Sequence, residues 1–312
     1  MPRGHRVFLP KTIRNMNTKT TIFVLALAVL ATGACKKNNA QDEPKIPIRI
    51  SSTVSKVTED SFVAGDAIGL YVVNATEAAG GNWTSGELSS GGNHLDNVKF
   101  TYNDNWDSDQ QYYWKDARTK ADFYCYYPYV SNISDVTAVK MSLKADQSSK
   151  EAFEACEILW GKTALVTPTD NKVSIISGHR NSQLVIELKP GKGFTQESLD
   201  AAISSIKVNN IRLDASLNLK NGELSASGNV SEVSPYYDGS AYRAMIPPQK
   251  IDNAALVTLV IDGLERTLVQ TVDFTSNSRK KCTITIDKLN EGVNVSIGGW
   301  EDDNNDYGGT LN

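Results

Sequence analysis

Cys35 is the residue whose position most clearly suggests covalent chemistry. An apolar run, Thr21 to Leu30, follows Lys19, and the small residues 31–34 lead up to the cysteine. A positive residue, a short apolar run and a small-residue cleavage point are typical of a secretory signal, and this run is too short to cross a bilayer. A cysteine directly after Gly-Ala is the bacterial lipoprotein arrangement, in which the thiol receives a diacylglycerol. We therefore predict lipid attachment at Cys35, with an ordinary signal and a chance cysteine as the alternative.

The chain around this cysteine divides into a signal and a tether. Residues 1–34 form the expected signal peptide, and translation from Met16 would give its positive segment an ordinary length. Residues 35–45 lack apolar periodicity, so we interpret them as a lipidated, solvated tether. The sequence thus predicts an exported protein that a lipid anchors to a membrane.

The histidines and the other cysteines give little support for catalysis. After residue 34 only His94 and His179 remain, and neither lies in a nucleophile-elbow context. The sequence contains no GxGxxG, GxxxxGKS/T or HExxH motif. Cys125, Cys156 and His179 lack the CxxC pair that would make their convergence on a metal a strong prediction. We therefore expect no enzyme activity, no cofactor and no metal site.

The mature chain is acidic. Without residues 1–34 it has 27 basic and 36 acidic residues, a net charge of −9. Such a surface repels phosphate backbones, which argues against nucleic acid as a partner. Three cysteines remain after Cys35, and an odd number in an exported chain argues against a disulfide framework. We expect Cys125, Cys156 and Cys282 to be small, buried apolar residues.

Short β-rich segments separated by Gly, Asn, Asp and Pro fill the mature chain. The pairs Asn221-Gly222 and Asp262-Gly263 predict two hairpins, because glycine tolerates the positive φ of a tight turn. Many short strands at this spacing predict sandwiches, since a sheet that buries one face needs a second sheet to cover it. One helix is predicted over 195–206. The expected fold class is all-β with one or two short helices.

The length of the mature chain, 278 residues, is enough for two domains of ordinary size. The run PGKG at 190–193 is the preferred linker. It gives an N-terminal β-sandwich over 46–190 and a C-terminal β-sandwich with an acidic tail over 191–312. A boundary nearer 167–171 is the alternative.

The folded part is expected to open with a strand. In IPIRISSTV, Ile46, Ile48 and Ile50 fall on one side, and Arg49 and Ser51 fall on the other. This period of two predicts a half-buried strand with its isoleucines toward the core. A slip of one residue would turn them to solvent, so the pattern fixes the register.

Aromatic residues concentrate in one part of the chain, with 11 of the 25 between Phe100 and Tyr129. In the segment 121–127 both faces of the expected strand are apolar or aromatic. An internal core is one interpretation. The other is an exposed platform for stacking on sugars, with Trp106 and Trp114 as the candidate residues.

Several segments, taken together, resemble the fimbrillin family, the subunits and accessory proteins of type V pili on Gram-negative anaerobes. The resemblance covers roughly residues 17–308, and the segments occur in the order found in that family. They are FVAGDAIGLYVV (62–73), YYWKDARTKADFYCYYPYV (112–130), EILWGKTALVT (157–167), VSIISGHRNSQLVIEL (173–188), YRAMIPPQ (242–249) and CTITIDKLNEGVNVSIGGWEDD (282–303).

The resemblance implies two tandem transthyretin-like β-sandwich domains and assembly by strand exchange. Family precursors travel to the surface as lipoproteins, and an arginine-directed protease cuts near the first strand. That strand leaves, and a strand from the C-terminal region of the next subunit fills the groove that opens. Carried over, Cys35 is the lipid attachment and Arg49 is the best candidate for the cut, with Lys45 and Lys56 as rivals. The exchangeable first strand is Ile46, Ile48 and Ile50. The candidate donor strand is Val293, Val295 and Ile297.

Three functions follow as hypotheses. The first is a structural or accessory pilus subunit at the cell surface, whose partners are other pilus subunits, the outer membrane through the lipid anchor, and host or bacterial glycans or proteins. The second is a lipid-anchored glycan-binding protein that does not polymerise, and it would use the aromatic residues of 100–129. The third is a surface hydrolase.

Overall fold

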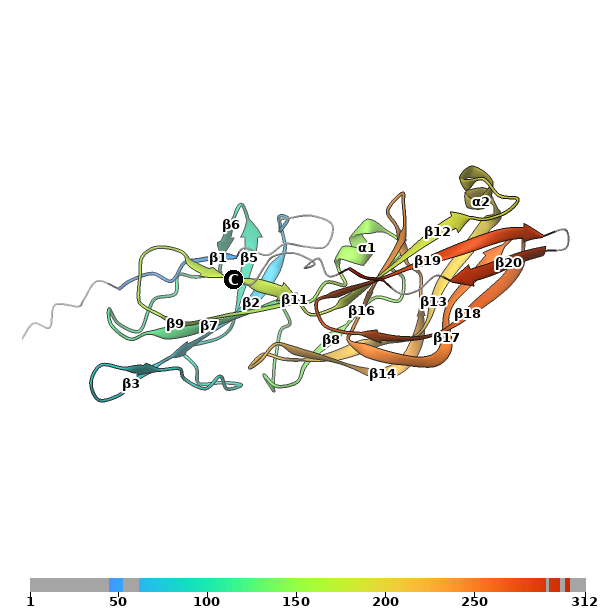
Figure 1. The fold of residues 1–312 in the computed structure, drawn as a ribbon. Coiled ribbons are helices and arrows are strands. Elements are labelled where there is room, and N and C mark those ends of the chain that lie inside the picture. Colours follow the sequence, from blue (N-terminus) through green and yellow to red (C-terminus); the bar gives the residue numbers. More distant parts are fainter. Residues whose placement is uncertain (1–44, 53–61, 290–291, 298–300, 304–312) are drawn as a thin grey trace, which may run out of the picture. The chain divides into compact units, whose positions relative to one another are not determined.

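The structure is a computed structural model that describes residues 45–52, 62–289, 292–297 and 301–303. All of these residues belong to one compact unit, 42–312. Figure 1 labels most of the elements, which are β1 (Ile50–Ser52), β2 (Ala67–Asn74), β3 (Thr76–Glu77), β4 (Trp83–Thr84), β5 (Leu95–Asn103), β6 (Asn105–Asp107), β7 (Ala121–Tyr127), β8 (Val139–Ser142), α1 (Lys150–Glu154), β9 (Leu159–Val166), β10 (Val173–Ile175), β11 (Ser177–His179), β12 (Ser182–Pro190), α2 (Gln196–Ala202), β13 (Ile203–Asn218), β14 (Glu223–Val233), β15 (Tyr236–Tyr237), β16 (Tyr242–Ile246), β17 (Gln249–Ile261), β18 (Leu264–Phe274), β19 (Ser278–Leu289), β20 (Gly292–Ile297) and β21 (Glu301–Asp303).

The first large sheet has the strand order β11-β9-β7-β2-β5-β6. Its strands pair antiparallel, and β7 lies between β2 and β9. Every residue of β7 is buried. Tyr124 and Tyr126 join one hydrophobic cluster, while Phe123, Cys125 and Tyr127 join another. Alternate side chains of a strand point to opposite faces, so both faces of this sheet are covered.

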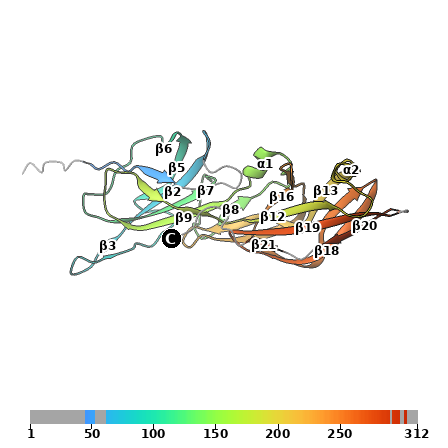
Figure 2. The same cartoon turned by 45° about the horizontal axis from the view of Figure 1, so that its top comes forward.

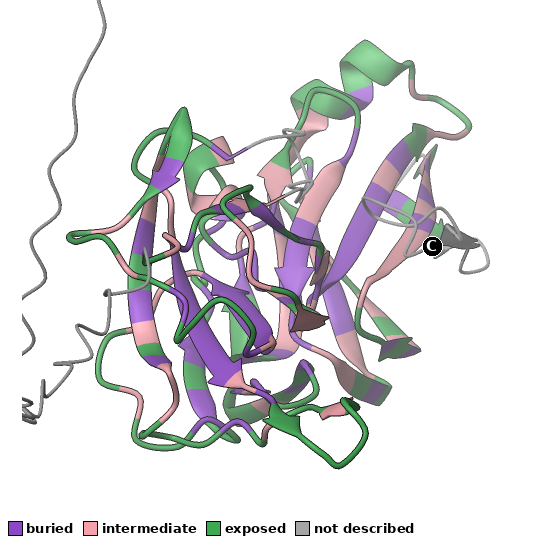
Figure 3. Cartoon of the chain, turned by 90° about the vertical axis from the view of Figure 1, so that its left-hand side faces the viewer, coloured by how far each residue is buried: buried purple, intermediate pink, exposed green. Residues whose placement is uncertain are grey.

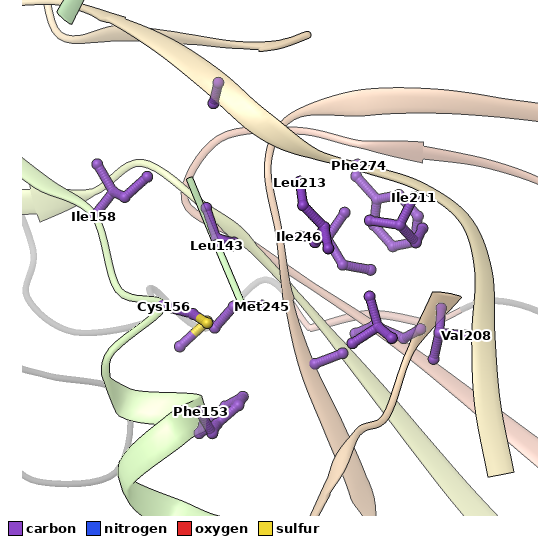
Figure 4. Close-up of a cluster of buried hydrophobic side chains, with 14 of the residues drawn as sticks. Leu143, Phe153, Cys156, Ile158, Val208, Ile211, Leu213, Met245, Ile246 and Phe274 are labelled. Carbon is purple, nitrogen blue, oxygen red and sulfur yellow. The ribbon is translucent and has the colours of Figure 1, made fainter. Parts of the chain in front are cut away.

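Among the described residues, β1 with β10 and β3 with β4 form two-stranded sheets, and two larger sheets contain the remaining strands. One has the order β15-β16-β12-β19-β20, with β21 also paired to β19, and the other has the order β14-β13-β17-β18, with β8 also paired to β13. Apolar side chains from both sheets enter the larger hydrophobic cluster, Ile186 and Ile284 from one sheet and Val208 and Leu259 from the other. Figure 3 shows the buried residues of the strands in purple. Figure 4 shows the part of this cluster next to α1, around Phe153. This arrangement is what the sandwich prediction requires.

The predicted all-β fold with short helices is confirmed. Both predicted hairpins form, β13–β14 and β17–β18, and Gly222 and Gly263 have the positive φ that was expected. The predicted helix starts where expected, with Thr195 as a cap that accepts a hydrogen bond from the Ser198 amide. It ends at Ala202, earlier than predicted, because Ile203 already pairs with β17 as the first residue of β13.

The strands from Ser182 onward pair within the later sheets, and β8, although it precedes His179, already pairs with β13. His179 ends β11, which pairs with β9, whereas β12 pairs with β16 and β19. Figures 1 and 2 show β12 running beside β19. By pairing, β12 therefore belongs with the later strands, although we expected it to precede the linker at 190–193. The division into two domains remains a prediction.

Candidate functional site

The segment that leads into β1 is hydrogen-bonded to the loop 112–114 along one edge. The Ile48 amide donates to the Tyr112 carbonyl oxygen at 2.8 Å, and the Trp114 amide donates to the Ile46 carbonyl oxygen at 2.9 Å. Pro47 forms a bridge with Tyr113 between these two bonds. The segment therefore has a strand-like partner on this side.

The opposite edge of the segment is bonded to β10. The Val173 amide donates to the Arg49 carbonyl oxygen at 2.8 Å, and β1 continues in parallel with β10 as far as the pair Ser52 and Ile175. β10 is itself tied to β9, because the Thr163 hydroxyl donates to the Ser174 carbonyl oxygen at 2.9 Å. Residues 46–52 are thus inserted between two pieces of chain and hydrogen-bonded to both.

The isoleucines of this segment enter the hydrophobic cluster beneath it. The side chains of Ile48 and Ile50 are 3% and 2% exposed, and the half-buried Ile46 packs against the same cluster. Phe100 and Phe123 are among the buried members of that cluster. Each fully buried isoleucine contributes about 1.5–3 kcal/mol. Removing residues 46–52 would therefore leave an apolar groove with two unpaired backbone edges, and we call this site the β1 groove.

Arg49 lies inside the inserted segment. Its side chain is exposed, and its guanidinium donates to the Asp170 carbonyl oxygen at 3.1 Å. The buried Ile48 and Ile50 flank it in the chain. A cut after Arg49 would release Ile46 and Ile48 but would leave Ile50 and the rest of β1 paired with β10. The position of Arg49 therefore does not fit the release of all three isoleucines by one cut.

The two rival cut sites lie on either side of the segment. Lys45 is exposed and precedes all three isoleucines, so a cut there would release none of them. Lys56 lies outside the described residues. In the sequence it is the first basic residue after β1, and no other Lys or Arg occurs before Lys99. A cut after Lys56 would release the whole inserted segment.

A polar cavity of about 320 Å³ adjoins the β1 groove. Its lining includes Arg49, Gln111 and Lys172. The Gln111 side-chain amide donates to the Ile48 carbonyl oxygen at 3.2 Å, and the Lys172 ammonium donates to the Asn105 side chain at 2.6 Å. Polar side chains therefore line the cavity on this side of the inserted segment, whereas the hydrophobic cluster packs beneath it.

Trp106 and Trp114 are not available as an exposed platform for sugars. Their side chains are 7% and 5% exposed and belong to the cluster under β1. The Trp114 indole donates to the Thr169 carbonyl oxygen at 3.1 Å, and Trp106 packs edge-on against Phe62 with the ring centroids 4.7 Å apart. The prediction of glycan stacking at these two residues is wrong, because both rings help to build the core that holds the first strand.

The candidate donor strand is an edge strand in its own subunit. Val293, Val295 and Ile297 lie in β20, which pairs antiparallel with residues 284–289 of β19. Val293 is buried, and Val295 packs against the larger cluster. Within the described residues no second strand pairs with β20. The donor candidate is therefore held along one backbone edge, whereas the first segment is held along both.

The remaining predicted residues are placed as follows. Cys35 and the rest of the tether up to residue 44 lie outside the described residues. Cys125, Cys156 and Cys282 are buried as predicted, and burial raises the pKa of the Cys125 thiol to about 12.

The buried polar groups do not form a metal-ligand set. His179 is buried, and its Nδ1 contacts the buried carboxylate of Glu157. Among the residues that the structure describes, no group of three or more His, Cys, Asp and Glu side chains is arranged to hold a metal ion. No helix within the described ranges is long and apolar enough to cross a membrane.

Two relatives with known names share moderate sequence similarity with this chain. A candidate fimbrium subunit, Fim1C of Bacteroides uniformis, is 24% identical over 306 residues, which cover 91% of this chain and 96% of that protein. A candidate fimbrium tip subunit, Fim1C of Bacteroides ovatus, is 26% identical over 220 residues, which cover 64% of this chain and 38% of that protein.

Solved structures share the fold. A candidate cell adhesion protein from Bacteroides uniformis superposes with a TM-score of 0.60 at 23% identity, over 82% of this chain and 97% of that one. A candidate cell adhesion protein from Bacteroides ovatus superposes with a TM-score of 0.62 at 14% identity, over 83% of this chain and 98% of that one. The sequence model of the fimbrillin-like family matches residues 55–300, which is most of the chain. This chain therefore belongs to the fimbrillin-like family.

Proposed function

We propose that this protein is a structural or accessory subunit of a pilus at the cell surface, with a role in adhesion, and that the β1 groove is where one subunit joins the next. The observation that carries the proposal is the inserted first segment, which is hydrogen-bonded along both edges and buries Ile48 and Ile50. Family membership and the names of the relatives support the same role. The partners are other pilus subunits, of the same or a related kind.

Strand exchange at this groove has a clear driving force. A groove without its strand exposes apolar side chains and two unpaired edges, both of which favour pairing with a supplied strand. The β20 sequence VNVSI has apolar residues at the same spacing as IPIRI in the first segment. In its own subunit β20 is paired only with β19 among the described strands, whereas in the β1 groove it would have a partner on each side. A β20 strand transferred into another subunit would be bonded by the loop 112–114 on one edge near its start and by β10 on the other edge near its end, in place of its ladder to β19.

The anchor and the domains complete the proposal. Lipid attachment at Cys35 would hold the precursor on the outer membrane until the first segment is removed. The two tandem sandwiches would then have separate tasks, since the β1 groove lies between the loop 112–114 and β10, whereas β20 belongs to one of the later sheets. The change in strand pairing between β11 and β12 makes 180–181 our preferred boundary between them, with β8 as the earlier strand that is contributed to the later domain.

The proposal predicts which proteolytic cut permits assembly. The purified precursor is treated with a lysine-specific or an arginine-specific protease, the new N-terminus is identified by mass, and polymers are detected as ladders that resist mild denaturant. A cut after Lys56 removes Ile46, Ile48 and Ile50 together, so we expect ladders. A cut after Arg49 leaves Ile50 in place, so we expect few ladders or none.

Two substitutions make this experiment specific. Lys56→Gln should abolish the ladders that lysine-specific cleavage produces, whereas Lys45→Gln should leave them unchanged, because Lys45 precedes the inserted segment. Protein that stays monomeric after a complete cut at Lys56 would contradict strand exchange at the β1 groove. Ladders that form equally well after the Arg49 cut would show that Ile50 need not leave.

A further inference from the structure

Two C-terminal strands pair with the edge of β19 that β12 does not use. β20 pairs with residues 284–289, and β21 pairs with residues 279–281 of the same strand. Figure 2 labels β19, β20 and β21 in this part of the fold. The sequence suggested a solvated acidic tail after residue 300, but Glu301–Asp303 form a paired strand. β20 and β21 are therefore both docked on β19 within the same subunit.

β21 and the part of β19 with which it pairs carry opposite charges. β19 begins with Ser278 and three consecutive basic residues, while β21 is entirely acidic. The register places each basic residue opposite an acidic one, in the pairs Arg279 with Asp303, Lys280 with Asp302, and Lys281 with Glu301. Opposite charges directly across an antiparallel ladder attract each other. All three register positions of β21 therefore favour docking.

The basic residues also have partners that do not depend on the tail. The Arg279 Nε donates to the Gln183 side-chain oxygen at 2.8 Å, and the Lys281 ammonium lies 2.8 Å from a carboxylate oxygen of Glu187. Undocking of β21 would therefore leave Arg279 and Lys281 with polar partners. This lowers the cost of release, because a charge without any partner is expensive to leave in a partly buried site.

The β20 half is held more simply. Among the described residues, β20 is held by the ladder to β19, by the buried Val293 and the half-buried Val295, and by a hydrogen bond from the Arg266 Nε to the Val293 carbonyl oxygen at 3.1 Å. An edge strand held in this way is among the parts of a fold that open most readily. Added attraction at β21 would therefore have a large influence on how often β20 is released.

We infer that β21 and the basic start of β19 form an electrostatic latch, which keeps the C-terminal segment on its own subunit and opens as the salt concentration rises. The purpose of the latch rests on the proposed function, because it would control when β20 can reach a neighbouring subunit. Screening acts on the latch strongly, since the Debye length falls from about 10 Å at 0.1 M salt to about 3 Å at 1 M.

Hydrogen exchange tests the latch in the uncut, monomeric protein, measured at those backbone amides of residues 293–297 that bond to β19 and are therefore protected at low salt. Raising the salt from about 0.05 M to about 1 M should speed their exchange by about tenfold. The triple variant Glu301→Lys, Asp302→Lys and Asp303→Lys should exchange at least as fast at low salt and should slow, if anything, as salt is added. The milder variant Glu301→Gln, Asp302→Asn and Asp303→Asn should be fast at all salt concentrations.

A matched control separates the latch from total charge. Glu197→Lys, Glu223→Lys and Glu232→Lys change three exposed acidic residues away from β21 and should leave the exchange of residues 293–297 as in the wild type. Hydrogen-exchange rates that change neither with salt nor with the β21 substitutions would refute the latch. The prediction of ladders after the Lys56 cut would be unaffected by that result. Conversely, a salt-sensitive segment in a protein that never polymerises after that cut would retain the latch and refute strand exchange.

Discussion

Replacing Ile50 with aspartate is expected to release the first segment from the β1 groove without any proteolytic cut. The substitution removes a side chain whose burial contributes about 1.5–3 kcal/mol, and an unpaired carboxylate at a buried position costs several kcal/mol more. The population with an occupied groove should therefore fall by about two orders of magnitude or more relative to the empty state. The amide of Val173 reports this directly, because its acceptor is the Arg49 carbonyl oxygen. Its hydrogen exchange should accelerate by a similar factor.

The adjacent substitution Ser51→Asp is the matched control. It adds the same charge one residue further on, at a position that is half-buried and that alternates to the other side of the strand. We expect the Val173 amide to stay protected in this variant. If the groove accepts strands from other subunits, concentrated Ile50→Asp protein should also form denaturant-resistant ladders without protease. Unchanged protection of Val173 in Ile50→Asp would mean that the first segment is not held by its buried side chains.

Replacing Gly161 with alanine is expected to damage the wall of the same groove. Gly161 lies in the centre of β9, between its register partners Cys125 and Ser177. A Cβ atom there would lie 2.3 Å from the backbone carbonyl oxygen of Ile176, the residue that follows β10. Backbone must move to relieve this contact, so β10 should shift away from β9. Such overpacking costs about 1–3 kcal/mol, which corresponds to a fall in Tm of roughly 2–10 °C for a protein of this size.

The neighbouring glycine provides the comparison for this variant. Gly178 pairs with Trp160, beside the Gly161 pair, and a Cβ atom there would meet nothing nearer than the Arg180 guanidinium at 3.6 Å. Gly178→Ala should leave both Tm and the exchange of the Val173 amide unchanged. The comparison is made by thermal unfolding and by hydrogen exchange of the Val173 amide in both variants. Equal Tm values for the two variants would show that β10 can be displaced at little cost in stability. The packing of Gly161 would then not hold the wall of the groove in place.

Local sequence rules predicted much of the secondary structure. The period-two pattern in IPIRI correctly placed Ile48 and Ile50 toward the core, because alternate side chains of any strand point to opposite faces. The pairs Asn221-Gly222 and Asp262-Gly263 correctly located two hairpins, because the constraint on φ is local to the turn. The helix was predicted from its cap but made too long, since pairing of Ile203 with β17 outweighs its helical pattern.

Contacts between residues far apart in the sequence were needed to place Trp106, Trp114 and Arg49. Sequence alone left open whether Trp106 and Trp114 lie in a core or form a platform, because aromatic residues suit both, and the burial of the rings settled it. Arg49 was a reasonable cut site as a basic residue near the first strand. The structure added that the Ile50 left behind by such a cut is buried and belongs to a strand paired with β10.

The sequence by itself determined the family, the all-β class and the face of the first strand that is apolar, since each depends on composition, order or local periodicity. The tertiary structure decided that residues 46–52 lie between the loop 112–114 and β10, and that the acidic β21 lies along the basic start of β19. The physical reason is the same in both cases. A backbone edge bonds to any strand of suitable twist, so the choice of partner is made by the packing of the whole fold and cannot be read from either segment alone.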